Sequence, residues 1–174
     1  MASYKEIVTK TVIGKAKKTS KNNIKVNPEQ IPNTVLGCWV INHSFSGVND
    51  KGIVKLNGSY DVNVWYSYDS DHKTAVTTKT FNYTDTMNVP VKNDGTINDE
   101  SEIIVRSLKQ PTVSDVKING NDVDLVIEKE MGVEVVGEGK IKVSIEENED
   151  DYDEIIDEDK IDEVVDHIDT EYLD

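Results

Sequence analysis

The chain has 174 residues, of which 36% are hydrophobic and one is a cysteine. That length suits one domain of ordinary size plus a segment that adds little to a core. No run of eighteen apolar residues is present, so we expect no membrane insertion, and the first ten residues lack the apolar core of a signal peptide. The single cysteine excludes a disulfide within the chain but leaves one between chains open.

The net charge of −15 is concentrated at one end of the chain. Residues 1–145 hold 18 Lys/Arg and 18 Asp/Glu, whereas residues 146–174 hold 16 Asp/Glu and only Lys160. Residues 1–25 are basic, with seven lysines against Glu6. We therefore divide the chain into a β-rich body, residues 1–145, and an acidic C-terminal tail, residues 146–174. Because such a tail repels phosphate, we expect no nucleic-acid binding.

The first half of the body is rich in Val, Ile, Thr and Tyr, which favour strands. Strands are predicted over residues 6–13 and 35–43, with loop signals following the second. Residues 53–68 alternate with a period of two, as a half-buried antiparallel strand requires, and residues 73–87 continue the pattern as a hairpin. One face of residues 53–68 is apolar or aromatic: Tyr60, Val62, Val64, Tyr66 and Tyr68.

In the second half of the body, the sequence pattern predicts the secondary structure less clearly. Residues 102–108 fit either a strand or a short helix, residues 113–118 and 123–128 form a predicted hairpin, and residues 133–136 and 141–145 form another. Short strands separated by turn signals predict a mainly β fold. We expect an antiparallel β-sandwich or barrel-like body, built as one unit or as two small β units.

The acidic tail contains an apolar stripe. Its charge opposes compact folding, so we expect the free tail to be disordered, but its apolar spacing permits two short amphipathic helices that fold on a partner. Calcium binding by residues 150–154 is an alternative, although the glycine of an EF-hand loop is missing, and we expect no metal. The tail residues expected to bind a partner are Tyr152, Ile155, Ile156, Val164, Val165, Ile168, Tyr172 and Leu173.

Catalytic motifs are not found. The histidines His43, His72 and His167 accompany no nucleophile elbow and no zinc-binding pair. Cys38 lies among apolar neighbours, which favours a buried thiol over a disulfide between chains, and either of these over a catalytic thiolate. We expect neither a catalytic residue nor a cofactor.

Two surfaces remain as candidates for binding. The aromatic residues of 60–83 are expected to pack a core, with a sugar-binding face as the alternative. Trp65 is out of phase with the tyrosines and is a candidate exposed interface anchor. The basic residues Lys15, Lys17, Lys18 and Lys21 form either a solvated face or a contact with the tail of another copy, and such heterologous contacts build open assemblies.

Three runs carry a family resemblance: YKEIVTK at 4–10, LGCWVINH at 36–43 and GSYDVNVWYSY at 58–68. With the acidic tail and its closing Glu171-Tyr172-Leu173, they make the chain similar to the CotE family of outer spore coat morphogenetic proteins over nearly its whole length.

The resemblance implies a non-enzymatic scaffold made in the mother-cell cytoplasm during sporulation and then located in the spore coat. It implies a homo-oligomer that docks on the inner coat through the basement-layer morphogenetic protein and recruits outer coat proteins. The acidic tail would serve recruitment and multimer formation. The alternative from the residues alone is a carbohydrate-binding β-sandwich module that uses the Tyr/Trp-rich strand face.

Overall fold

A computed structural model describes residues 3–92 and 94–146. The strands are β1 (Ser3–Val26), β2 (Thr34–Asp50), β3 (Ile53–Tyr68), β4 (Lys73–Met87), β5 (Glu102–Asn119) and β6 (Asp122–Ile145). The described chain ends, residues 3–5 and 143–146, belong to a separate unit, and the fold below is that of residues 6–142. Within the described ranges, no helix is long and apolar enough to cross a membrane.

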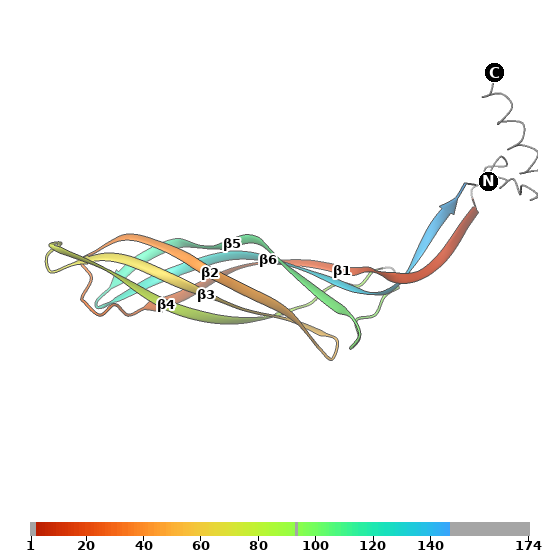
Figure 1. The fold of residues 1–174 in the computed structure, drawn as a ribbon, viewed down its shortest axis with the longest axis horizontal. Helices are drawn as coiled ribbons and strands as arrows, with labels where there is room; N and C mark the ends of the chain where they lie inside the picture. Colours follow the sequence, from red (N-terminus) through yellow and green to blue (C-terminus); the bar gives the residue numbers. More distant parts are fainter. Residues whose placement is uncertain (1–2, 93, 147–174) are drawn as a thin grey trace, which may run out of the picture. The chain divides into compact units, whose positions relative to one another are not determined.

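The strands form two three-stranded antiparallel sheets, with the orders β1-β6-β5 and β2-β3-β4 (Figure 1). Adjacent hairpins β2–β3, β3–β4 and β5–β6 run antiparallel, and β2 also lies against β5 of the other sheet. A single bridge joins Gly14 of β1 to Val91, which follows β4. The predicted mainly β, antiparallel sandwich is confirmed.

The core lies between the inner faces of the two sheets and falls into two clusters. One contains Leu56 of β3 with Val133 of β6, and the other contains Tyr60 of β3 with Leu125 of β6. Both clusters draw side chains from both sheets. The body is therefore a single sandwich and not two small β units.

The hairpin of β3 and β4 is confirmed in position and phase. Tyr60 pairs with Phe81 and both face inward, whereas Trp65 pairs with Val76 on the outer face. The turn at residues 69–71 has three successive residues with positive φ. Since Asp, Asn and Gly tolerate this conformation best, the polar turn signal was informative.

The second half differs from the sequence prediction. β5 is one strand through residues 102–108 and beyond, so the helix alternative is wrong. The predicted hairpin of residues 133–136 and 141–145 is also wrong, because β6 continues through Gly137 and Gly139. Gly137 packs against Ile13 of β1, where a Cβ atom would lie 3.0 Å from the Ile13 Cδ1. Gly137 therefore permits close packing, and neither glycine forms a turn.

Two irregularities shape the inner surface. A bulge in β2 leaves Asn42 with a φ of 55° and turns His43 toward the interior. Gly47, also on β2, has no room for a side chain, because a Cβ atom would lie 2.7 Å from the Val105 Cγ2 on β5. The sheets therefore approach each other closely at this point.

Candidate functional site

A buried lysine separates the two core clusters. Inward side chains of β6 alternate without a break from Val123 to Val135, and Lys129 is the middle member, with 1% of its surface exposed. Its Nζ donates to Ser20 Oγ at 2.8 Å and lies 3.8 Å from Asp85 Oδ2. It also lies 4.1 Å from the ring centroid of Tyr83, a cation–π distance. The charge is thus compensated from β1 and from β4.

A partly buried histidine adjoins this cluster. His43 Nε2 lies 2.6 Å from the Tyr83 hydroxyl oxygen, and His43 Nδ1 lies 3.1 Å from Gln110 Oε1. A neutral imidazole satisfies both contacts when Nδ1–H donates to Gln110 and Nε2 accepts the Tyr83 hydroxyl proton. Gly58 faces Tyr83 in the register, and a Cβ atom there would overlap the Tyr83 ring.

Burial governs the protonation of this cluster. Desolvation lowers the pKa of Lys129, and the nearby Asp85 carboxylate partly opposes that shift. Desolvation also lowers the pKa of His43, a hydrogen bond with Gln110 opposes it, and the positive charge of Lys129 adds to it. Burial and the Asp85 charge raise the pKa of Tyr83 to about 12. At neutral pH the cluster therefore holds a neutral phenol, and protonation of His43 would add a second cation beside Lys129.

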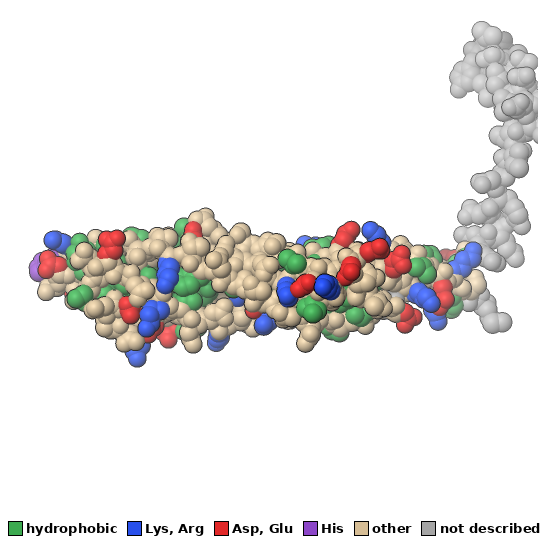
Figure 2. All heavy atoms as spheres, turned by 90° about the horizontal axis from the view of Figure 1, so that it is seen from below, with side chains coloured by type: hydrophobic (Ala, Val, Ile, Leu, Met, Phe, Trp, Pro, Cys, Tyr) green, Lys and Arg blue, Asp and Glu red, His purple; other side chains and the backbone are tan. Residues whose placement is uncertain are grey.

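The outer face of the β1-β6-β5 sheet is a charged surface. Carboxylates at alternate positions of central β6 lie between cations of β1 and β5. Figure 2 shows acidic and basic side chains next to one another along the face that it views. The ion pairs are Lys15–Glu134, Lys17–Glu130, Lys25–Asp122, Arg106–Glu134 and Lys109–Glu128. Most of the lysines of these pairs are well exposed, so each pair contributes little stability.

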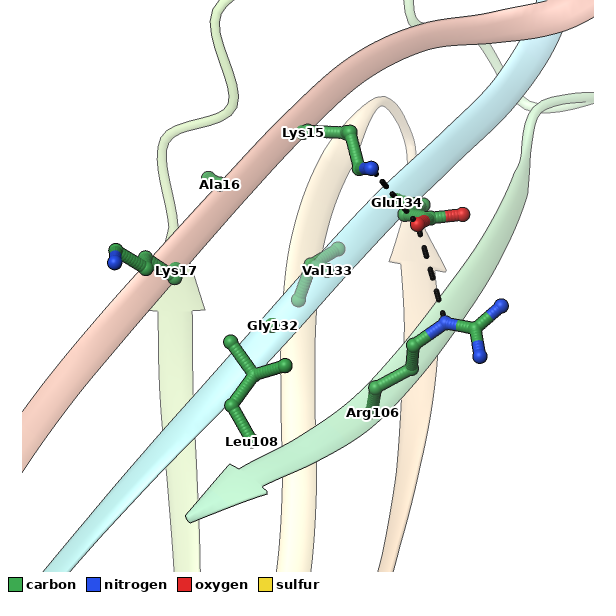
Figure 3. Close-up of a pocket in the computed structure, with 8 residues that line it drawn as sticks. All are labelled: Lys15, Ala16, Lys17, Arg106, Leu108, Gly132, Val133 and Glu134. Carbon is green, nitrogen blue, oxygen red and sulfur yellow. Dashed lines mark ion pairs between the residues drawn. The ribbon is translucent and has the colours of Figure 1, made fainter.

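An open pocket lies on this charged surface, over Gly132 (Figure 3). Lys15 and Arg106 approach Glu134 Oε1 from opposite strands, at 3.3 and 3.9 Å. Leu108 covers the position where Gly132 lacks a side chain. The pocket thus combines exposed cations with an apolar floor.

The predicted basic residues separate in the structure. Lys15, Lys17 and Lys21 are exposed on β1, and the first two pair with β6. Lys18 is also exposed, but its Nζ lies 3.4 Å from Asp85 Oδ1 on β4. The basic stretch is therefore partly neutralised by the chain's own carboxylates.

The outer face of the β2-β3-β4 sheet carries exposed aromatic residues. We call Gly37, Trp39, Ile41, Trp65 and Val76 the tryptophan patch. Both tryptophans are 41% exposed, and a Cβ atom on Gly37 would contact both indole rings. Trp65 is thus exposed as an anchor would be, and Trp39 was not predicted to accompany it.

Polar side chains surround the tryptophan patch. Asp61 accepts hydrogen bonds from Asn42 and Thr80, which lower the pKa of its carboxyl group. Thr78 donates to Asn63 at 2.6 Å. These bonds link polar side chains of β2, β3 and β4 beside the two indole rings.

The remaining sequence candidates have different positions. Cys38 is half-buried against the cluster of Tyr60, and burial raises the pKa of its thiol, which disfavours a thiolate. Tyr60 and Tyr66 are 2% exposed, so they cannot line a sugar-binding face. The tail candidates, from Tyr152 to Leu173, lie outside the described residues. Within residues 3–92 and 94–146, no three His, Cys, Asp or Glu side chains are grouped as metal ligands.

Sequence reasoning missed the buried cluster. The signal was in β6, where Lys129 occurs in phase with Ile127 and Met131. The prediction ended one strand at residue 128, began the next at residue 133 and placed a turn at Gly137, which hid this continuous alternation. Its partners Ser20 and Asp85 are distant in the sequence, so no local pattern identifies them.

The Lys129 charge gives the first prediction. Asp85→Asn should lower the free energy of unfolding by about 3 kcal/mol, because it removes the carboxylate facing a buried cation. Lys129→Met should change it by less than about 1 kcal/mol, since an apolar side chain joins the two clusters and Asp85 keeps Lys18. Urea unfolding of the full chain measures both. A Lys129→Met variant less stable than Asp85→Asn would contradict this account.

The lowered pKa of His43 gives a pH dependence. The folded state favours the neutral form of His43. The contribution of neutral His43 to the free energy of unfolding is therefore complete above the ordinary histidine pKa of about 6.5. It is lost as the pH falls through that value toward the folded-state pKa. Between pH 7.5 and 5.5, His43→Gln should therefore lose less stability than the wild type in urea unfolding. The exposed His72→Gln is the matched control, and equal slopes for all three proteins would refute the prediction.

Comparison with known proteins gives one match. The family model of outer spore coat protein E (CotE) matches residues 3–174, essentially the whole chain. No curated protein and no solved structure matches it. The match includes both the β-sandwich and the acidic tail, in agreement with the resemblance found in the three sequence runs. The chain therefore belongs to the CotE family of outer spore coat proteins.

Proposed function

We propose that this protein is a non-enzymatic, self-assembling scaffold of the spore coat. It is made in the mother-cell cytoplasm, docks on the inner coat layer and recruits outer coat proteins. The tryptophan patch carries the proposal, because it exposes Trp39 and Trp65 next to the exposed apolar side chains of Ile41 and Val76. Tryptophan is enriched among the residues that contribute most to protein–protein binding.

The buried cluster supports a structural and not a catalytic role for the ionisable groups. His43 is held by Tyr83 and Gln110, and Lys129 by Ser20 and Asp85. Cys38 faces the core with a raised pKa, so we assign it to packing before a disulfide between chains. These groups stabilise the sandwich that presents the outer surfaces.

The acidic tail is the proposed recruiting segment. Its 16 carboxylates would attract basic coat proteins at long range, and its apolar stripe would add short-range specificity. Many copies on one assembly increase avidity, so each contact can be weak. The tail of one copy can also compete with Glu134 and Glu130 for Lys15 and Lys17 of another, since exposed ion pairs exchange at little cost.

A carbohydrate-binding module is the second candidate. The tyrosine face of β3 is buried, so only the exposed rings of Trp39 and Trp65 remain for stacking on a sugar. Glycan binding by the full chain that disappears in Trp65→Ala, together with a monomeric protein, would favour this candidate.

Self-association of the full chain tests the scaffold. Light scattering behind size exclusion should show wild-type assemblies larger than a dimer, and Trp39→Ser with Trp65→Ser should reduce their mass. Ile53→Ser is the matched control, because Ile53 is 50% exposed on β3 but lies outside the tryptophan patch. A wild-type chain that stays monomeric at high concentration would overturn the proposal.

Recruitment by the tail gives a separate prediction. Ile155→Asp with Val165→Asp should abolish binding of purified outer coat proteins and leave the unfolding midpoint of the body unchanged. As a control, Asp153→Asn with Asp166→Asn removes charge but keeps the apolar stripe, and should weaken binding only in a salt-dependent way. Full binding by the first variant would show that charge alone is sufficient.

A further inference from the structure

One part of the sandwich consists of only two strands. β5 begins at Glu102, which pairs with Val136 of β6, so among the described strands only β1 lies beside β6 beyond Val136 (Figure 1). We call residues 6–12 of β1 with residues 137–142 of β6 the terminal ribbon. A two-stranded ribbon is only marginally stable in water.

The terminal ribbon exposes apolar side chains on both faces. Ile7 is 45% exposed and Val8 is 63% exposed, and neighbouring residues of a strand point to opposite faces. Val12 is also exposed. Neither face is therefore covered within the described part of the chain.

The outer edge of β1 is open along this ribbon. At Ile13 the edge is occupied, because the Lys92 N–H donates to the Ile13 carbonyl oxygen at 2.6 Å and Gly14 bridges to Val91. From Glu6 to Val12, no strand of the described chain pairs with that edge. Open edges of this kind can accept a strand from another chain.

The sequence of this edge is complementary to itself. In an antiparallel pair with a two-fold axis at Val8, Val8 faces Val8 and Glu6 faces Lys10 of the second copy. A shift of one residue in either direction places Glu6 opposite Thr9 or Thr11 and loses both charge pairs. Among the described residues, the Lys10 ammonium group pairs with Glu102, at 3.6 Å, and this exposed ion pair competes weakly with a partner from a second copy.

We propose that a second copy of this chain docks on the β1 edge of the terminal ribbon, antiparallel and centred on Val8. This contact is isologous, so each copy uses the same edge. The ribbon becomes four-stranded, which exceeds the minimum for a stable sheet. The inference rests on the proposed self-assembly and names one contact through which it occurs.

Charge exchange on the full chain tests the register. Glu6→Lys or Lys10→Glu places like charges opposite each other twice per dimer. Since two attractive cross-strand charge pairs become repulsive, the dissociation constant of this contact should rise by roughly tenfold. The double variant Glu6→Lys with Lys10→Glu should restore it. Sedimentation at low salt measures the constants, with Glu102→Gln as the control for the existing contact of Lys10.

Cross-linking provides an independent measurement. In a Cys38→Ser background, Val8→Cys should form a dimer under oxidising conditions, because directly opposed residues bring their Cβ atoms to about 5 Å. Thr9→Cys should not form a cross-linked dimer, because in this register Thr9 faces Ile7 of the second copy and not its own equivalent. If large assemblies form, their dissociation constant is unchanged by the Glu6 and Lys10 substitutions, and Val8→Cys does not cross-link, then this contact is wrong and the scaffold proposal still stands. A monomeric wild type would overturn both.

Discussion

The sandwich depends on how one buried charge is compensated. Lys129 interrupts an otherwise apolar line of β6 side chains, and its partners come from β1 and β4. A buried ammonium group without those partners would cost several kcal/mol. Any slip of β6 by one residue would place Lys129 on the outer face and its acidic neighbours in the core. We infer that the lysine specifies the register between strands more than it increases stability.

The same constraint explains the irregular strands around it. Bulges in β2 and β5 bring His43 and Gln110 into contact across the two sheets, next to Tyr83. Gly58 makes space for the Tyr83 ring where a Cβ atom would overlap it. The polar cluster therefore needs one missing side chain and two backbone irregularities. The two hydrophobic clusters on either side complete the core.

The sequence predicted the parts of the fold that depend on local pattern. The β3–β4 hairpin follows from alternation and a polar turn, and the exposure of Trp65 follows from its phase. The course of β6 was missed because Gly137 was interpreted as a turn residue, whereas Ile13 packs closely against it from a strand distant in sequence. Lys15 and Lys17 were identified as basic, but their carboxylate partners depend on the pairing of β1 with β6. Composition and the alternation of apolar residues do not reveal which strands, distant in the sequence, pair with each other.

The outer surfaces differ in how they resist association. On the β1-β6-β5 sheet, charges of both signs satisfy one another, so a partner gains little by displacing them. Within the described chain, the tryptophan patch has no such ion pairs, and the edge of the terminal ribbon has the exposed contact of Lys10 with Glu102. An edge strand is normally protected by uncompensated charge. In the proposed contact, Glu6 and Lys10 are spaced so that a second copy would neutralise them, whereas an unrelated strand would leave both charges without partners. Such selectivity is what the proposed self-assembly of one kind of chain would require.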